Sequence, residues 1–247
     1  MGCNFASENK IKSTSNPLTT ILMNATDNTA STAIKEVHNL IIVDRSGSMW
    51  NIAPQAIAGV NETLGTIRAA QQSTGIMQYV TIVSFCGCCT KVFCKNSPVK
   101  DVPHMTGRDY EPCCNTPLYD AMGESIITLR EYLQNRSDYA VSVTIITDGY
   151  ENSSKKWNAS SIKALVELLK ADGWLFAYIG ANQDVRKVSH DISIDNSMSF
   201  QATPEATDDM FMKERSARMR WSQKLSKKMS SMERNEKYFD DTDLTDE

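Results

Sequence analysis

A short polar segment carries the first side chains that could do chemistry. Asp44, Ser46 and Ser48 stand at alternate positions in the sequence Asp44-Arg45-Ser46-Gly47-Ser48, directly after an apolar run. In a turning loop, alternate side chains can converge on one point, so this segment offers three oxygen ligands to a hard cation such as Mg²⁺ or Mn²⁺. Alone the spacing is weak support, because a helix cap with serines in a turn has the same pattern.

Two further residues strengthen the interpretation as a cation site. Thr116 comes just before an expected helix, and Asp148 follows a second apolar run over residues 142–147. Both apolar runs are typical of strands buried in a parallel sheet. The carboxyl ends of such strands meet at one edge, which is where open α/β sheets bind ligands. The sequence therefore predicts that all five oxygen-bearing side chains face one crevice.

A second group of reactive side chains is a cluster of cysteines. Six of the seven cysteines lie between residues 86 and 114. The cluster consists of Cys86, Cys88, Cys89, Cys94, His104, Cys113 and Cys114. Zn²⁺ takes four thiolate or imidazole ligands, but the spacing here is irregular, so zinc stands beside redox-sensitive thiols, a reversible disulfide and ordinary half-buried side chains as alternatives. A secreted disulfide framework is disfavoured, since such chains are shorter, evenly paired and preceded by a signal peptide.

Alternating strands and helices must position these side chains. The expected strands cover residues 39–43, 79–85, 91–95, 142–147, 175–179 and 197–201. Apolar residues three and four apart predict helices between them, at about 53–67, 118–133, 162–169 and 185–190. A short connection around Gly87 predicts a hairpin, which makes the third strand an antiparallel edge strand. We expect an α/β fold with a doubly wound, mostly parallel six-stranded sheet, helices on both faces, and the cysteines near its carboxyl edge.

Three of these segments resemble the signature segments of von Willebrand factor type A (VWA) domains, which carry a metal-ion-dependent adhesion site (MIDAS). The matching runs are residues 41–49, 115–122 and 145–149. They follow the order of the family, and the resemblance extends over about residues 36–201. It implies a Rossmann-like VWA fold and an intracellular protein of the prokaryotic type.

The resemblance also assigns a role to each oxygen-bearing side chain. Ser46, Ser48 and Thr116 would bind the cation with their hydroxyls, while Asp44 and Asp148 would act directly or through bound water. Two carboxylates leave the ion electrophilic and with an open coordination position, which an acidic side chain of a partner can fill. The expected function is protein binding that depends on Mg²⁺, Mn²⁺ or Ca²⁺, with a partner that supplies Asp or Glu. Similar intracellular proteins work in multiprotein assemblies, some with AAA+ ATPases.

An enzyme is the competing class of function. A cation beside Asp44 and Asp148 could polarise a phosphoryl group, as in a metal-dependent phosphoester hydrolase. A clustered cysteine could instead serve a thiol-based or zinc-based redox or regulatory protein. The sequence has no Gly-x-x-x-x-Gly-Lys phosphate loop and no Gly-x-Gly-x-x-Gly fingerprint, and no histidine stands beside an evident nucleophile. We therefore expect no catalysis.

Composition limits the class of protein further. The 247 residues are 41% hydrophobic, which is enough to bury a core, and the formal charge is −4. Such a charge gives no global attraction to nucleic acid or to an anionic membrane. No apolar run approaches the roughly 18 residues that span a bilayer, and the first residues lack the pattern of a signal peptide. We expect a cytoplasmic protein that binds neither nucleic acid nor membranes.

Charge also divides the chain into four expected parts. These are a polar, flexible leader over 1–35, a VWA domain over 36–202, a C-terminal helix over 203–234 that is basic in its middle, and an acidic tail over 235–247. The basic helix and the tail indicate a solvated helix face and a frayed end. The minority alternative is a tail that occupies the cation of its own or a neighbouring chain, or that pairs with the basic helix. Arg45 is expected to be a solvated loop residue or a contact at the rim of the site.

Overall fold

A single six-stranded sheet organises the computed structural model, which describes residues 33–181, 184–227 and 229–240. The strands are β1 (Glu36–Asp44), β2 (Met77–Phe85), β3 (Thr90–Pro98), β4 (Tyr139–Thr147), β5 (Leu175–Ala181) and β6 (Asn196–Phe200). The α-helices are α2 (Ala53–Thr74), α3 (Leu118–Leu133), α4 (Ala159–Ala171), α5 (Val185–Asp191), α6 (Pro204–Leu225) and α7 (Ser231–Asn235). Two 3₁₀ helices, η2 (Gly47–Ile52) and η3 (Val99–Asp101), complete the described elements.

The strand order, β3-β2-β1-β4-β5-β6, confirms the predicted doubly wound topology. Neighbouring strands pair in parallel, except that β3 runs antiparallel to β2 at the edge, as the short connection predicted. From β1 the chain winds outward through β2 to β3, and from β4 it winds the other way to β6. The direction therefore reverses between β1 and β4, and the carboxyl ends of these two strands flank the point where α/β sheets bind ligands.

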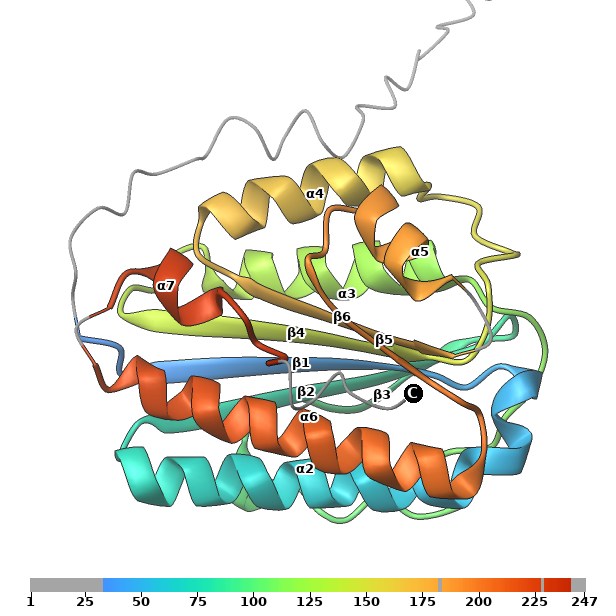
Figure 1. Cartoon of the computed structure of the whole chain (residues 1–247), viewed down its shortest axis with the longest axis horizontal. Coiled ribbons are helices and arrows are strands. Elements are labelled where there is room, and N and C mark those ends of the chain that lie inside the picture. Colours follow the sequence, from blue (N-terminus) through green and yellow to red (C-terminus); the bar gives the residue numbers. More distant parts are fainter. Residues whose placement is uncertain (1–32, 182–183, 228, 241–247) are drawn as a thin grey trace, which may run out of the picture.

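Two hydrophobic cores, one on each face, explain the continuous apolar run over residues 40–43 of β1. Ile41 and Val43 pack into the core that α2 and α6 cover, whereas Leu40 and Ile42 pack into the core under α3, α4 and α5. Figure 1 shows this arrangement, with α2 and α6 on one side of the sheet and α3, α4 and α5 on the other. Successive strand residues point to opposite faces, so a strand covered on both sides has a nearly continuous apolar run.

The C-terminal segment differs from the single helix expected over residues 203–234. It forms α6, which ends at Leu225, and the short helix α7. The basic face is not wholly solvated, because Arg218 is only 1% exposed. Its guanidinium donates to Glu214 Oε1 at 2.6 Å, to Asn39 Oδ1 on β1 at 2.7 Å and to Thr144 Oγ1 on β4 at 2.8 Å. A buried guanidinium is tolerated when a carboxylate and further acceptors surround it.

The start of the acidic tail packs against the domain. Tyr238 and Phe239 are buried in the core of the α2 and α6 face, and Asp240 pairs with Arg220 at 3.3 Å. The remaining tail residues, 241–247, and leader residues 1–32 lie outside the described part of the chain. The division of the chain into four parts stays a prediction. Among the described helices, none combines the length and apolar character needed to cross a membrane.

Candidate metal centre

The five candidate ligands occupy three loops at the carboxyl edge of the sheet, around the reversal point between β1 and β4. These residues are Asp44, Ser46, Ser48, Thr116 and Asp148. Asp44 is the last residue of β1, Ser46 is the N-cap of η2, and Ser48 is the second residue of that 3₁₀ helix. Thr116 stands two residues before α3, and Asp148 directly follows β4. Segments that are far apart in sequence therefore bring their oxygen atoms to the same edge.

Hydrogen bonds join four of these residues directly. The backbone N–H of Ser46 donates to Asp44 Oδ1 at 2.6 Å, which shapes the loop as short acidic side chains often do in turns. The Oγ atoms of Ser46 and Ser48 lie 3.1 Å apart, and the Ser48 hydroxyl donates to Asp148 Oδ1 at 2.6 Å. The first and third loops are therefore in contact through their candidate ligands.

The surroundings of Gly149 show where Thr116, the fifth candidate ligand, lies relative to the others. A methyl group built on its Cα would lie 3.3 Å from Thr116 Oγ1, 3.5 Å from Ser48 Oγ and 3.9 Å from Asp44 Oδ2. One small volume beside Gly149 is thus surrounded by oxygens from all three loops. A side chain at this position would fill part of that cradle.

Burial sets the electrostatics of the two carboxylates. Asp44 is fully buried, and this burial raises its pKa to about 6 even though the Thr147 hydroxyl and Ser46 donate hydrogen bonds to it. The nearby Asp148 charge raises the pKa of Asp44 further, and burial also raises the pKa of Asp148. A neighbouring cation would favour the charged form of both groups. The donor set consists of oxygen atoms alone, which suits Mg²⁺, Mn²⁺ or Ca²⁺ better than a soft metal.

Three supporting residues were missed in the sequence. Thr147 donates its hydroxyl to Asp44 Oδ2 at 2.6 Å, and the Tyr110 hydroxyl donates to the Asp44 carbonyl. Asn152 Oδ1 accepts the backbone N–H of Thr116 at 2.9 Å. Thr147 adjoins the Asp-Gly pair after β4, so its place next to a candidate ligand was a usable signal. Tyr110 comes from a remote loop, whereas Asn152 lies in the same loop as Asp148, and nothing in their local sequence indicates these contacts.

The expectation for Arg45 is wrong, because its side chain is buried with only 2% exposed. Its Nη1 donates to the Glu111 carbonyl at 2.6 Å and lies 3.6 Å from Cys113 Sγ. Its Nη2 donates to the Cys89 carbonyl at 3.3 Å and lies 3.2 Å from Cys89 Sγ. The guanidinium has several donors in a rigid fork, so the two loops that flank it can supply acceptors in place of water.

Five of the seven residues in the predicted cysteine cluster lie together. The Sγ atoms of Cys86, Cys88 and Cys113 all lie within 4.8 Å of one another, and those of Cys86 and Cys113 are 3.0 Å apart. Cys114 directly follows Cys113 in the chain but does not belong to this group of three. Cys89 closes the group through its contact with the buried guanidinium.

The other two members lie elsewhere. Cys94 is on β3, with its thiol directed to the Val80 carbonyl at 3.6 Å, and burial raises its pKa to about 11. His104 is exposed and does not belong to the group of three thiols, which is the one such group found among the described residues. Cys86 and Cys89 stand at Cys-x-x-Cys spacing, a regularity that we overlooked in the sequence.

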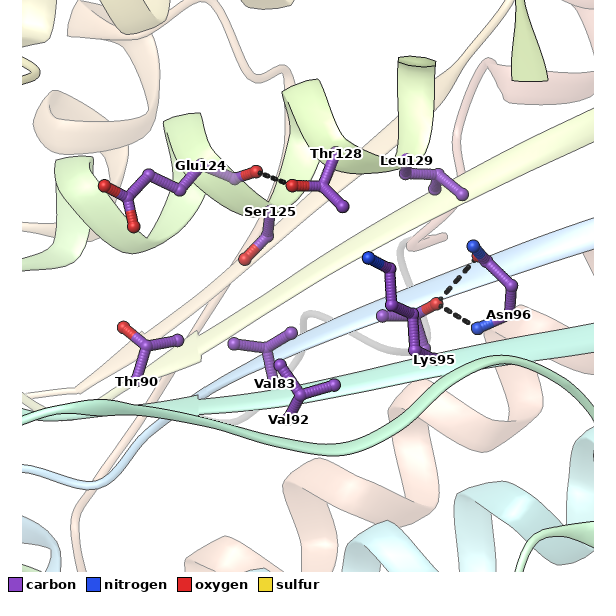
Figure 2. A pocket seen from close by; sticks show the side chains of 10 residues that line it. Val83, Thr90, Val92, Lys95, Asn96, Glu124, Ser125, Thr128 and Leu129 are labelled. Atoms are coloured by element: carbon purple, nitrogen blue, oxygen red, sulfur yellow. Dashed lines mark hydrogen bonds between the residues drawn. The ribbon is translucent and has the colours of Figure 1, made fainter. Parts of the chain in front are cut away.

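A groove on the α3 side of the β2–β3 hairpin is separate from the candidate cation site and from the group of cysteines. It has a volume of about 180 Å³ and lies between β2, β3 and α3 (Figure 2). Val83, Val92 and Leu129 supply apolar lining, and the residues lining the groove include none of the candidate ligands. The dashed lines at Asn96 in Figure 2 are its hydrogen bonds with Thr81, whose hydroxyl donates to Asn96 Oδ1 at 3.1 Å and accepts the Asn96 backbone N–H at 2.9 Å. The groove therefore gives no support to a ligand site at the carboxyl edge.

Comparisons with known proteins show the fold. The sequence matches no protein-family model and no curated protein at a significant level. The pilus adhesin SpaC from Lactobacillus rhamnosus GG has a TM-score of 0.56 at 12% identity, over 76% of this chain and 31% of the adhesin. Proximal thread matrix protein 1 from the mussel byssus has a TM-score of 0.51 at 12% identity, over 73% of this chain and 45% of that protein.

A third match is the TRAP protein of Plasmodium vivax, solved in a manganese-loaded form. Its TM-score is 0.50 at 16% identity, and the match covers 72% of each chain. The solved neighbours include VWA domains. The mixed sheet, mostly parallel with one antiparallel edge and flanked by helices, is consistent with the VWA fold. This chain spans less than half of the adhesin and of the mussel protein, and identities this low establish the fold alone.

Proposed function

We propose that this chain is a protein-interaction module that binds an acidic side chain of a partner through a divalent cation. The VWA-like neighbours suggest a protein-interaction module, and the manganese-loaded TRAP protein supports a divalent cation in such a fold. The observation that carries the proposal is the cradle beside Gly149, where oxygens from three loops surround one small volume. Oxygen-only cradles of this kind fit hard cations.

In this proposal the hydroxyls of Ser46, Ser48 and Thr116 hold the cation, and Asp44 and Asp148 lie behind them. The Ser48 hydroxyl donates its proton to Asp148, so Ser48 accepts from the Ser46 hydroxyl with one lone pair and has the other free to face a cation. A bound Mg²⁺ or Mn²⁺ would supply a Lewis acid with an open position for a carboxylate. In this arrangement the three hydroxyls orient the cation, and the carboxylates of Asp44 and Asp148 are held out of direct contact with it.

The supporting residues keep the hydroxyls in place before any cation arrives. Thr147 and the Ser46 backbone amide hold both oxygens of the Asp44 carboxylate. Asn152 fixes the loop of Thr116 through a backbone hydrogen bond. Because Mg²⁺ requires near-octahedral geometry, prior fixation of the ligands lowers the cost of binding it.

Two exposed aromatic residues favour a protein as the partner. Trp50 is 65% exposed and Tyr150 is 56% exposed. Each stands two residues after a candidate ligand, Ser48 and Asp148 respectively. Tryptophan and tyrosine dominate the binding energy of protein interfaces. Large aromatic side chains that flank the cradle therefore suit a macromolecular partner better than a free small acid. We include a multiprotein assembly, with or without an AAA+ ATPase, in this proposal.

Manganese titration of the purified chain tests the cation site. The loss of the free Mn²⁺ electron paramagnetic resonance signal counts bound ions, and added Mg²⁺ should displace them. Thr116→Val removes one hydroxyl without changing the side-chain shape, and we expect at least about tenfold weaker binding, or about 1.4 kcal/mol. Thr128→Val is the matched control, because the hydroxyl of Thr128 donates to the Glu124 carbonyl within its own helix.

The partner is tested by capture from cell extract in Mg²⁺ and in chelator. A true partner should be retained by the wild-type chain only in Mg²⁺, retained by Thr128→Val, and lost with Thr116→Val. Equal Mn²⁺ binding by both variants, or partner capture that chelator does not affect, would contradict the proposal.

A further inference from the structure

The loops that carry the cysteines surround the candidate cation site and are tied to it by backbone hydrogen bonds. Gly47 N–H donates to the Cys114 carbonyl at 3.0 Å, and Cys113 N–H donates to the Arg45 carbonyl at 2.9 Å. Gly87 N–H donates to the Asn115 carbonyl at 2.7 Å. The tip of the β2–β3 hairpin, the loop before Thr116 and the loop after β1 therefore form one unit.

Three thiols of this unit have the composition and proximity of a soft-metal site, and a fourth is their neighbour in the chain. Cys86, Cys88 and Cys113 lie within 4.8 Å of one another, and Cys114 directly follows Cys113. Zinc–sulfur bonds are about 2.3 Å long, so sulfur atoms in a tetrahedral zinc site are about 3.8 Å apart. The Cys86–Cys113 separation of 3.0 Å is shorter than that value, and the three sulfurs lie within 4.8 Å of one another, so a small outward movement of the thiols would admit the ion. Cys114 has a φ of +59°, a left-handed conformation that is rare outside glycine.

Arg45 gives an independent indication that anionic sulfur belongs here. Its guanidinium is buried, and within the described part of the chain its acceptors are two carbonyls and the thiols of Cys89 and Cys113. Its Nε has no hydrogen-bond partner in that structure. A buried cation needs a counter-charge, and none of these partners is a carboxylate. Thiolates would supply the missing negative charge.

We propose that Cys86, Cys88, Cys113 and Cys114 bind one Zn²⁺ as thiolates, with Arg45 as the neighbouring cation. Each thiol loses its proton to solvent on binding, so four protons are released and no electrons are transferred. Four thiolates and Zn²⁺ carry a net charge of −2, which Arg45 reduces to −1 in a site that is partly exposed to water. A disulfide between Cys86 and Cys113 would be neutral and would leave Arg45 without a counter-ion.

The zinc would join the hairpin tip to the loop that carries Thr116. Cys86 and Cys88 come from the hairpin tip after β2, whereas Cys113 and Cys114 stand two or three residues before Thr116. The site would therefore hold one hydroxyl ligand of the candidate cation site in position. This role is structural, and it stands whether or not the neighbouring oxygen site binds Mg²⁺.

Cobalt titration distinguishes the two sites in the full chain. The metal-free protein, kept reduced, is titrated with Co²⁺ in excess Mg²⁺, which occupies oxygen sites but does not bind thiolates well. A tetrahedral thiolate site gives intense visible bands and thiolate-to-cobalt charge transfer in the near ultraviolet. We expect one equivalent of Co²⁺ per chain with these bands, and loss of the bands when one equivalent of Zn²⁺ is added.

Matched variants decide which thiols are involved. Cys113→Ser and Cys86→Ser should lose the charge-transfer bands, whereas Cys94→Ser should keep them, because that thiol lies on β3 away from the cluster. Arg45→Met should weaken Co²⁺ binding by about 10 to 100 times, the usual effect of removing a group that supports metal ligands. The zinc content of the wild-type chain, purified without chelator, is a further measure that needs no variant to fold.

Three results would overturn the zinc site. One is a wild-type chain that contains no zinc and gives no charge-transfer bands with Co²⁺. Another is a Cys113→Ser variant whose bands equal those of the wild type. The last is a protein mass that is two hydrogen atoms below that of the fully reduced chain, together with two thiols that react only after a reductant is added. That result would identify a disulfide instead.

Discussion

Gly149→Ala should separate folding from cation binding. Gly149 does not have the left-handed φ that would make alanine strained, and the described contacts of the added methyl group are oxygens of the candidate ligands. Reduced freedom of the unfolded chain should stabilise the fold by about 0.4–1 kcal/mol. The same methyl would fill the cradle between Thr116, Ser48 and Asp44. One substitution is therefore expected to raise stability and to lower affinity for a cation.

The size of the affinity loss follows from the distances. At 3.3 Å from the new methyl carbon, Thr116 Oγ1 is closer than most side-chain carbons allow, so the hydroxyl must move by a few tenths of an ångström. Mg²⁺ holds its ligands at about 2.0–2.1 Å in a nearly ideal octahedron and tolerates such shifts poorly. We expect Mn²⁺ and Mg²⁺ to bind at least about tenfold more weakly, a loss of about 1.4 kcal/mol.

The assay combines Mn²⁺ titration with urea unfolding of the same preparation. Gly65→Ala is the control, because Gly65 is exposed on α2 and a methyl there meets nothing within 4 Å. The control should be stabilised by about 1 kcal/mol through helix propensity and should bind Mn²⁺ as the wild type does. Undiminished Mn²⁺ binding by Gly149→Ala would refute the reasoning that places the cation in this cradle.

Three other predictions concern pH, the buried ion pair and the aromatic rim. Burial lowers the pKa of His38 to about 4 from 6.5. As the pH falls, His38 is therefore protonated in the unfolded chain at a higher pH than in the folded chain. Stability should be full above pH 6.5 and fall by up to about 3 kcal/mol towards pH 4, and His38→Phe should flatten this slope in urea unfolding at several pH values. Glu214→Gln leaves a buried guanidinium without its counter-charge and should cost about 3–5 kcal/mol, whereas the double replacement Glu214→Leu with Arg218→Met should cost less; equal losses would contradict this explanation. Trp50→Ala should weaken partner capture by at least about tenfold without altering Mn²⁺ binding, and unchanged capture would remove the aromatic rim from the interface.

The sequence was most informative about strands that are buried on both faces and about the polar loops that follow them. Strands β1 and β4 are covered on both faces, so their apolar runs predicted them, and the polar residues after them marked the carboxyl edge. The alternation of Asp44, Ser46 and Ser48, with Thr116 and Asp148 at matching edge positions, predicted a group of oxygens that the fold brings together. Contacts within a loop, or at the end of a known strand, are encoded locally.

Contacts between remote polar residues could not be predicted in this way. Arg45 and Arg218 have the sequence context of solvated charges, yet both are buried because acceptors reach them from other segments. Asn39 and Thr144 interrupt strand cores where only tertiary structure supplies their partner, the α6 guanidinium. The end of α6 at Leu225 likewise depends on how the following residues pack. Charge patterns alone do not distinguish a solvated helix face from a buried ion pair.

Anomalous diffraction from a crystal soaked in Mn²⁺ tests the central proposal most directly. The account predicts one manganese peak beside Gly149, about 2.0–2.3 Å from hydroxyl oxygens of Ser46, Ser48 and Thr116. The peak should weaken when Mg²⁺ is added in excess and should be absent from Thr116→Val crystals. A soaked crystal with no manganese in this cradle, or with manganese only at the cysteine cluster, would contradict a cation-dependent binding function.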